Sequence, residues 1–226
     1  MFEHVTVPQI AELQGRVKSK TQEGKRVYMI DGKEKAYPSI TTVLGYFGKQ
    51  AIMEWRKRVG EEEANRISRQ AATKGTRVHS LVEDYINNRE VGIKDEMFHI
   101  QIAFKGIQSV LDNRLTAVYA QESALYSDYL KVAGRVDCVG IFDGKLSIID
   151  FKTSRRVKDR EDISNYFMQE AAYAIMFEEI TKMPVTRLVT IMAVDGIAEP
   201  LIFVERRDAW APELVKTIKR YYINNN

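Results

Sequence analysis

Short apolar runs in the second half of the chain predict a β-sheet. These runs are rich in Val, Ile, Leu and aromatic residues, which favour half-buried strands. The dipeptide Asp143-Gly144 is typical of a tight hairpin turn and predicts that the runs on either side of it pair with each other. Strands are expected at residues 115–126, 131–142, 145–151, 185–194 and 198–204.

Apolar residues repeat at helical spacing in most of the remaining sequence. Gly75 is expected to interrupt the first long helical region and to separate it from the second. Ser39 or Thr41 is expected to cap a short helix that ends near Leu44, after a hairpin at Asp31-Gly32. Longer helices are expected at residues 51–70, 76–88, 96–111, 159–180 and 210–222.

This order of elements indicates an α/β (α+β) fold in which helices flank a mixed central sheet. The chain has 226 residues, of which 45% are hydrophobic, and this is enough for one sizeable core. We therefore interpret residues 1–226 as a single domain. Within it, residues 1–114 form a hairpin and helical part, and residues 115–226 form the sheet core.

Composition excludes several classes of protein. The formal net charge is only +3, so any nucleic-acid surface must be local. Cys138 is the single cysteine, which excludes a disulfide within the chain and cysteine-ligated zinc or iron–sulfur clusters. The first residues lack the pattern of a signal or transit peptide, and no apolar run approaches the ~18 residues of a membrane span. We therefore expect a soluble, intracellular protein that has no membrane partner.

An acidic residue followed two positions later by lysine occurs four times, but only one copy ends an apolar run. The other three copies have glycine in the middle and are typical of turns. In the fourth copy, alternation along a strand places Asp150 and Lys152 on one face and Phe151 on the other. Taken alone, a buried Asp–Lys pair at a sheet edge explains this copy better than a catalytic site does.

The preceding strand favours a metal site over a purely structural Asp–Lys pair. If Asp143 and Gly144 are the two turn residues, the register places Asp137 opposite Asp150. Two opposed carboxylates repel each other, and a divalent cation between them removes that penalty. The sequence therefore predicts a divalent-metal site with Lys152 beside it.

The same residues belong to an ordered set of short motifs. The set consists of Pro38-Ser-Ile-Thr41, Trp55-Arg-Lys-Arg58, Gly75-Thr-Arg-Val-His79, Glu122-Ser-Ala, Gly134-Arg-Val-Asp137, Asp150-Phe-Lys152-Thr-Ser154 and Gln169-x-x-x-Tyr173. In this order the motifs resemble the PD-(D/E)XK nuclease superfamily, specifically its RecB-like exonuclease branch with the mitochondrial genome maintenance exonucleases and their phage relatives. The resemblance extends over roughly residues 36–195. It implies a restriction-endonuclease-like core that cuts DNA with Mg²⁺ or Mn²⁺.

The resemblance also implies a role for each residue of the site. It implies that Asp137, Asp150 and the carbonyl of Phe151 bind the metal, and Mg²⁺ prefers such hard oxygen ligands. Lys152 is expected to orient or help to deprotonate the attacking water and to offset charge on the phosphate. His79 becomes a further candidate ligand, although a lone helix histidine is more often a packing or surface residue.

Three other residues have both an ordinary and a catalytic interpretation. Glu122 matches the auxiliary acid of the family, although a strand carboxylate usually faces solvent. Gln169 and Tyr173 lie one helical turn apart, which helix–sheet packing alone would explain. The resemblance implies instead that they position the Lys152 region and the DNA backbone.

Basic residues gather in two places where the resemblance implies contact with DNA. The cluster around Trp55 is either a solvated helix face or a helical arch that passes single-stranded DNA, with bases stacked on aromatic rings. Arg155 begins the second group, just after the catalytic strand, where Thr153 and Ser154 either donate to a phosphate or cap the strand end. The residues expected to contact DNA are Trp55, Arg56, Lys57, Arg58, Arg77, Arg135, Thr153, Ser154 and Arg155.

Together these features predict a metal-dependent exonuclease that acts on single-stranded or flapped DNA ends. Residues 1–114 are then the part that guides DNA, and residues 115–226 are the part that cuts it. We expect a phage or bacterial protein in the cytoplasm of a bacterial host cell, with replication or recombination proteins as partners. The alternatives are a structure-specific flap endonuclease and a catalytically inactive DNA-binding module on the same scaffold.

Overall fold

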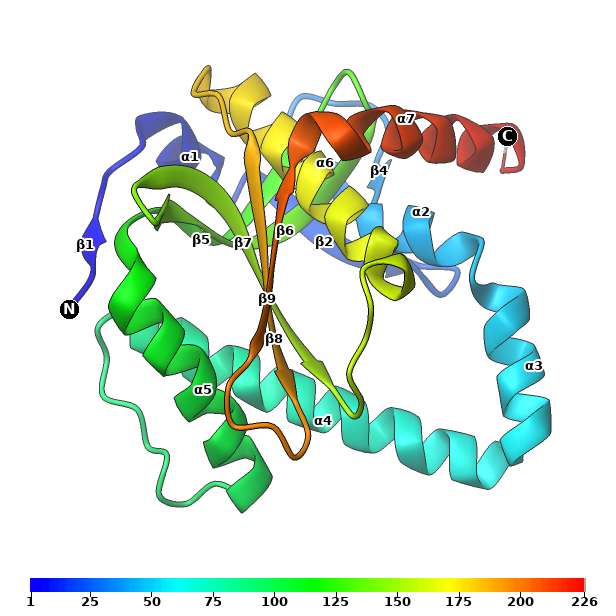
Figure 1. Ribbon diagram of the computed structural model, residues 1–226. Coiled ribbons are helices and arrows are strands. Elements are labelled where there is room, and N and C mark those ends of the chain that lie inside the picture. Colours follow the sequence, from blue (N-terminus) through cyan, green and yellow to red (C-terminus); the bar gives the residue numbers. More distant parts are fainter. Residues whose placement is uncertain (226) are drawn as a thin grey trace.

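The computed structural model describes residues 1–225, which form two β-sheets and a set of surrounding helices (Figure 1). The larger sheet has six strands in the order β1-β5-β6-β7-β8-β9. These strands are β1 (Glu3–His4), β5 (Leu115–Ser127), β6 (Val132–Phe142), β7 (Lys145–Ser154), β8 (Arg187–Val194) and β9 (Leu201–Arg206). β5, β6 and β7 pair antiparallel, whereas β7 and β8 pair parallel, which confirms the predicted mixed sheet.

Helices lie against both faces of this sheet (Figure 1). They are α1 (Pro8–Leu13), α2 (Ile40–Tyr46), α3 (Lys49–Val59), α4 (Glu61–Ile86), α5 (Phe98–Arg114), α6 (Ser164–Thr181) and α7 (Arg207–Ile223), with a short 3₁₀ turn at Glu161–Ile163. One apolar cluster joins the sheet to α4 and α5 and includes Ile149. A second cluster joins the opposite face to α6 and α7 and includes Ile148. Ile148 and Ile149 are consecutive in β7, so their side chains point to opposite faces of the sheet. One strand thus contributes to both apolar clusters.

The hairpin between β6 and β7 has the predicted turn. Asp143 and Gly144 have φ angles of 47° and 73°, and a type I′ turn requires positive φ at both of its central residues. Phe142 pairs with Lys145 directly across the turn. The predicted register is therefore confirmed at this end of the hairpin.

The other end of the hairpin differs from the prediction. The β6–β7 ladder ends at the pair Cys138–Ile149, one position before the predicted Asp137–Asp150 pair. Asp137 Oδ2 instead accepts the main-chain N–H of Phe151 at 3.0 Å, so this N–H is not available to the main chain of β6. The two carboxylates are therefore not held face to face as a ladder pair.

A smaller sheet lies beside β6, and its strands come between β1 and β5 in the chain. It consists of β2 (Val17–Gln22), β3 (Lys25–Ile30) and β4 (Tyr37–Pro38), and Ser39 forms a parallel bridge to Ala133 of β6. The pairing of β3 with β4 around Asp31-Gly32 confirms the predicted hairpin. β2 was not predicted because five of its six residues are exposed and four of them are Lys, Ser or Gln side chains without an apolar alternation.

The helical region between β4 and β5 is divided at Gly60 and not at Gly75. Gly60 has a φ of 86° and separates α3 from α4. α4 then continues for 26 residues through Gly75 without a break. A helical glycine costs only about 1 kcal/mol relative to alanine, which the packing of a long amphipathic helix offsets. A Cβ at Gly75 would lie 3.6 Å from Thr153 Oγ1, an ordinary contact distance, so α4 passes close to the end of β7 there.

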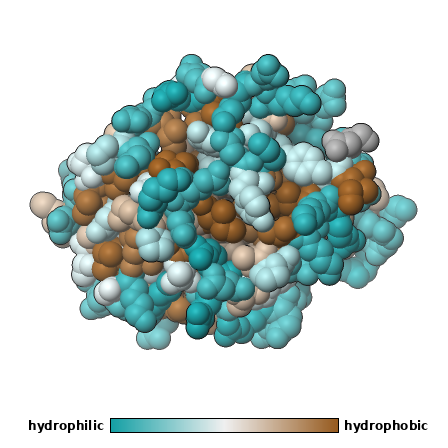
Figure 2. Space-filling view, turned by 90° about the horizontal axis from the view of Figure 1, so that it is seen from above, coloured by the Kyte–Doolittle hydropathy of each residue, from teal (hydrophilic) through white to brown (hydrophobic). Residues whose placement is uncertain are grey.

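Hydrophilic side chains form most of the rim of the face seen in Figure 2, and apolar side chains appear in patches between them. Phe104, Phe142 and Phe177 are among the largest fully buried side chains, whereas Phe98 and Tyr129 are exposed. Among the described residues, no helix combines the length and the apolar character that crossing a membrane would take.

Candidate active site

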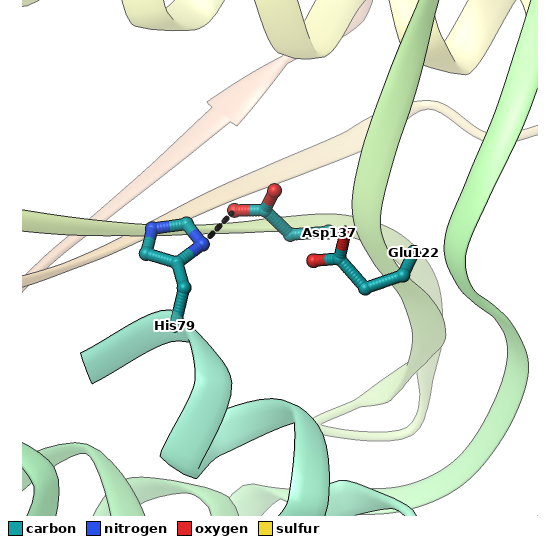
Figure 3. A group of neighbouring side chains, drawn as sticks. All are labelled: His79, Glu122 and Asp137. Atoms are coloured by element: carbon teal, nitrogen blue, oxygen red, sulfur yellow. Dashed lines mark ion pairs between the residues drawn. The ribbon is translucent and has the colours of Figure 1, made fainter. Parts of the chain in front are cut away.

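Three side chains from three different elements point toward one another beside the central sheet (Figure 3). They are His79 from α4, Glu122 from β5 and Asp137 from β6. One potential ligand atom of each lies within 4.8 Å of those of the other two. All three side chains are partly buried. The structure thus brings together three of the residues that the motifs singled out, although they are far apart in sequence.

The backbone of β5 and β6 is irregular at Glu122 and Asp137, and this irregularity directs both carboxylates toward the cluster. Glu122 has a φ of 45° in the middle of its strand, a conformation that L-residues adopt at a cost of roughly 1–2 kcal/mol. In β6, Val136 packs in the cluster on the α6 side, whereas Cys138 packs in the cluster on the α4 and α5 side. Residues two positions apart normally share one face of a strand, so the alternation changes phase at Asp137. Strained backbone of this kind is found at functional sites.

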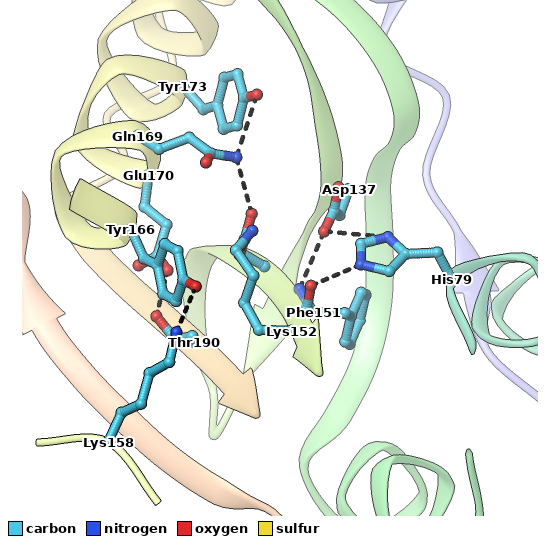
Figure 4. Close-up of polar contacts among 11 residues, drawn as sticks. His79, Asp137, Phe151, Lys152, Lys158, Tyr166, Gln169, Glu170, Tyr173 and Thr190 are labelled. Atoms are coloured by element: carbon cyan, nitrogen blue, oxygen red, sulfur yellow. Dashed lines mark hydrogen bonds and ion pairs between the residues drawn. The ribbon is translucent and has the colours of Figure 1, made fainter. Parts of the chain in front are cut away.

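Main-chain groups of Phe151 orient both His79 and Asp137 (Figure 4). His79 Nε2 lies 2.7 Å from the Phe151 carbonyl oxygen. Because a carbonyl only accepts hydrogen bonds, Nε2 carries the proton, and Nδ1 of the neutral ring keeps its lone pair. His79 Nδ1 lies 3.6 Å from Asp137 Oδ2. Metal-binding histidines are commonly fixed in this way through their other ring nitrogen.

The donor set of the cluster fits a divalent metal ion. One imidazole nitrogen and two carboxylates are ligands that Mn²⁺ accepts, and Mg²⁺ prefers the carboxylate oxygens. Burial, with the neighbouring Asp137 and Glu83 carboxylates, raises the pKa of Glu122 to about 7. A cation beside Glu122 would offset that repulsion and stabilise its charged form. The carbonyl of Phe151, predicted as a ligand, is hydrogen-bonded to His79 in this arrangement.

Asp150 lies apart from the three-residue cluster and contacts Lys152 and Gln169. Its side chain is almost fully buried and forms an ion pair with the Lys152 ammonium. Asp150 Oδ1 also accepts a hydrogen bond from Gln169 Nε2 at 3.1 Å. Burial raises the pKa of Asp150 to about 6, against the opposing effect of the Lys152 charge. The structure therefore gives Asp150 a direct contact with the lysine, while its predicted role as a metal ligand stays a prediction.

Lys152 carries its positive charge into the active-site region. Burial lowers the pKa of Lys152, but the Asp150 and Asp137 carboxylates outweigh this effect and raise it above its usual value. The ammonium also lies 5.0 Å from the centre of the Tyr166 ring, within range of a cation–π interaction. Lys152 is therefore an ammonium ion at neutral pH, suited to offset negative charge on a phosphate.

Glu170 lies near Lys152 and was not singled out in the sequence. Glu170 is fully buried and hydrogen-bonded to Thr190 (Figure 4). Burial and the nearby Asp150 carboxylate raise the pKa of Glu170 well above its usual range, which favours the neutral form of its carboxyl group. In the sequence, a glutamate within a helix resembles a solvent-facing residue, and no local signal marks it as buried.

Gln169 and Tyr173 face the sheet from α6, as their helical spacing predicts. Gln169 Nε2 lies 3.4 Å from Tyr173 Oη as well as near Asp150. The Tyr173 ring packs directly on the main chain of Gly134, where a Cβ would lie only 2.6 Å from Tyr173 Cε1. Only glycine at position 134 therefore allows this close approach of α6 to β6.

A cavity of about 670 Å³ connects these side chains. Its walls come from α4, from β5, β6 and β7, from α6 and from the small N-terminal sheet. Of the residues predicted to contact DNA, Arg135 and Thr153 line it. The other predicted site residues that line it are His79, Glu122, Asp137, Lys152, Gln169 and Tyr173.

The remaining predicted DNA contacts lie outside this cavity. Arg77 and Arg155 line a neighbouring groove of about 1140 Å³, and Thr76 and Ser80 line both spaces. The hydroxyl of Ser154 donates to the carbonyl of Arg156 at 2.7 Å, so it is engaged within its own turn. The cluster Trp55, Arg56, Lys57 and Arg58 lies on α3 and lines neither space.

Comparison with known proteins agrees with the motifs. The profile of the family described as the PD-(D/E)XK nuclease superfamily matches residues 90–220, more than half of the chain. The human protein named mitochondrial genome maintenance exonuclease 1 is 30% identical over 130 residues, which cover 54% of this chain and 38% of that protein. The protein of the same name from Xenopus tropicalis is 30% identical over 146 residues, with 60% and 42% covered. The chain thus spans about two fifths of the length of these relatives.

Among solved structures, a crystal structure of a protein from Eubacterium rectale aligns over 66% of each chain, with a TM-score of 0.46 and 11% identity. The family match covers β5, β6 and β7 and continues into α7. It therefore includes Asp137, Asp150 and Lys152, the residues on which the predicted resemblance most depends. The chain belongs to the PD-(D/E)XK nuclease superfamily.

Proposed function

We propose that this chain is a metal-dependent DNA exonuclease that hydrolyses phosphodiester bonds at single-stranded or flapped DNA ends. The observation that carries the proposal is the meeting of His79, Glu122 and Asp137 with the Lys152 ammonium around one cavity. Family membership supports nuclease chemistry. The printed name of the relatives, exonuclease, supports action at DNA ends.

In this proposal the chain holds the metal through His79, Glu122 and Asp137, with Asp150 and the Phe151 carbonyl as further predicted ligands. A bound Mg²⁺ or Mn²⁺ would lower the pKa of a water molecule and offset charge on the scissile phosphate. His79 presents the lone pair of Nδ1, because its Nε2–H is held by Phe151. Asp137 is kept in position by the Phe151 N–H.

Lys152 is proposed to bind the phosphate that is cut. Its ammonium is held between the Asp150 carboxylate and the Tyr166 ring, and this fixes its direction. Gln169 in turn positions Asp150 through its amide. In hydrolysis the water oxygen forms a new P–O bond and the P–O bond to the sugar oxygen breaks. One proton of the water goes to the leaving oxygen and the other is released, so the product phosphate carries additional negative charge, which an ammonium stabilises.

The path of the DNA strand is proposed from the two connected spaces. Arg135 and Thr153 would contact phosphates in the catalytic cavity, and Arg77 and Arg155 would contact them in the neighbouring groove. α3 has no buried residue, which supports a helix that contacts a ligand rather than the core. The residues 55–58 on α3 are therefore proposed as an arch over the strand, and residues 1–114 as the part that guides DNA.

Several finer predictions about biology belong to the same proposal. A phage or bacterial source, a place in the cytoplasm of a bacterial host, and replication or recombination proteins as partners are all expected for such a DNA exonuclease. The word mitochondrial in the names of the relatives describes those proteins and is not carried over to this chain.

The proposal is tested with end-labelled linear and covalently closed circular single-stranded DNA, incubated with Mg²⁺, Mn²⁺ or EDTA. We expect degradation of linear strands only, and only with a metal. Lys152→Ala should abolish cleavage, because the phosphate loses its cation, whereas Glu199→Ala, an exposed carboxylate outside the cavity, should cleave normally. Cutting of circles would show an endonuclease, and binding without metal-dependent cleavage would show a DNA-binding module.

A further inference from the structure

The small N-terminal sheet supplies one wall of the catalytic cavity. Ser19 from β2 and Arg26 and Tyr28 from β3 line it together with Arg135 from β6. Neither the motifs nor the charge clusters of the sequence mark Ser19, Arg26 or Tyr28. The hairpin therefore adds polar groups to the site that come from outside the central sheet.

Strand register explains how one face of the hairpin serves two purposes. Side chains alternate along β3, so Arg26, Tyr28 and Ile30 point to the same side. Ile30 and Tyr28 pack in a small core with Val17 and Ala133. Arg26 lies beyond this core on the same face and is exposed. The hairpin face is thus apolar where it rests on β6 and polar where it borders the cavity.

The main chain fixes the position of Arg26. Its carbonyl oxygen accepts the main-chain N–H of Ser39 at 3.0 Å and the hydroxyl of Thr42 at 3.3 Å. These hydrogen bonds hold the main chain of Arg26 against the beginning of α2. The main chain is thus already ordered before a ligand binds, which lowers the entropic cost of binding.

Several arginines of the chain have a carboxylate partner, and Arg26 has none among the described residues. Arg56, Arg66, Arg77 and Arg114 each pair with a carboxylate. Within residues 1–225, Arg26 forms no ion pair, and Arg135 reaches Glu122 only at 3.7 Å. Tyr28 lies close to both arginines: burial raises the pKa of its hydroxyl, and the Arg26 and Arg135 charges offset part of that effect. Its hydroxyl is protonated at neutral pH and is able to donate a hydrogen bond.

We infer that Arg26, Tyr28 and Arg135 form a binding site for a phosphodiester group next to the one that is cut. Two guanidinium groups and a hydroxyl match phosphate oxygens in charge and in donor geometry. The scissile phosphate belongs at Lys152 and the His79 cluster, so the hairpin site holds a neighbouring phosphate of the same strand. This inference rests on the proposed function, and it assigns the ligand as a nucleic-acid single strand.

Binding rather than cleavage tests the inference, so that it does not depend on the outcome for catalysis. A fluorescent single-stranded oligonucleotide is titrated in EDTA and followed by anisotropy. Arg26→Ala should raise Kd about tenfold, the effect of losing a charged hydrogen bond. Lys20→Ala is the matched control, because Lys20 is a cation of the same hairpin that does not line the cavity. Its Kd should stay within about twofold of the wild-type value.

A neutral methylphosphonate placed at one linkage at a time shows which phosphate is held. In the wild type, one linkage should weaken binding, and in Arg26→Ala the same linkage should have no further effect. Equal Kd values for Arg26→Ala and Lys20→Ala, equal sensitivity of wild type and Arg26→Ala at every linkage, or no binding of single strands by the wild type would each overturn the inference. Arg26→Gln provides a second variant if Arg26→Ala lowers the melting temperature. Cleavage by a wild type that fails these tests would leave the proposed function standing.

Discussion

Alanine at position 134 tests how closely α6 approaches the catalytic strand. Gly134 does not have a positive φ, so alanine adopts its backbone without strain and only steric contacts matter. The new Cβ would lie 2.6 Å from Tyr173 Cε1, 3.1 Å from Tyr173 Oη and 3.2 Å from Ile40 Cγ2. Tyr173 is 2% exposed and Ile40 is 0% exposed, so both side chains are packed mainly against other protein atoms.

The expected cost follows from this overlap. Inserting a methyl group into a close-packed core lowers the free energy of unfolding by about 1–3 kcal/mol. For a chain of this length, that corresponds to a fall in Tm of about 2–12 °C. Displacement of Tyr173 should also slow cleavage, because Tyr173 and Asp150 share the amide of Gln169.

Urea unfolding of Gly134→Ala and of a control measures this cost. Gly45→Ala is the control, since it lies in α2 and a Cβ there would meet nothing within 4 Å. It should leave stability unchanged or raise it by up to about 1 kcal/mol. In a Tyr173→Leu background, the penalty of Gly134→Ala should largely disappear, because the clashing ring atoms are absent. Wild-type stability for Gly134→Ala, or an undiminished penalty in that background, would refute the reasoning.

Three further predictions follow from charge. Hydrogen bonds from Arg114 hold the pKa of Asp143 below its usual value, so its contribution to stability is present above about pH 4 and is lost as the pH falls. Asp143→Asn should therefore lower Tm at pH ~7 but match the wild type near pH ~2; an equal difference at both would contradict this. Because burial and the Asp150 carboxylate favour the neutral form of Glu170, Glu170→Gln should keep urea stability and the cleavage rate near wild type, and a large loss would show a charged Glu170. Replacing Arg56 and Lys57 by alanine should weaken binding of single strands and reduce its salt dependence, and unchanged affinity would remove the arch.

Local sequence signals were enough for most of the fold. Asp143-Gly144 fixed both the β6–β7 turn and its register, because only residues that tolerate positive φ form such a turn. The break predicted at Gly75 was wrong, because α4 continues through this residue and its packing against the rest of the protein offsets the cost of a helical glycine. The polar strand β2 has no alternation of its own, and only its pairing with β3 makes it a strand.

The motifs pointed to several residues that line the candidate site, but not to the contacts that these residues form. His79, Glu122 and Asp137 each fell in a motif, and the structure brings them together. Asp150 instead contacts Lys152, since the phase of β6 changes at Asp137 and the ladder stops there. That change depends on contacts between distant segments, and no pattern within one strand reveals it.

Residues that carry no motif were missed for the same reason. Glu170 looks like a surface glutamate until α6 is packed on β8. Arg26 and Tyr28 belong to a hairpin whose position over the cavity depends on the contact between the two sheets. Their proposed part in binding therefore follows only from the three-dimensional arrangement.

The central claim is that the cluster of His79, Glu122 and Asp137 supports metal-dependent cleavage, and one measurement tests it most directly. Single-turnover cleavage of an end-labelled linear single strand is followed as Mn²⁺ is added to the wild type, Asp137→Asn and Glu199→Ala. We predict that the rate of the wild type and of Glu199→Ala rises with Mn²⁺ and saturates, whereas that of Asp137→Asn stays at the level seen in EDTA. A near-normal rate for Asp137→Asn, or cleavage by the wild type in EDTA, would contradict the claim.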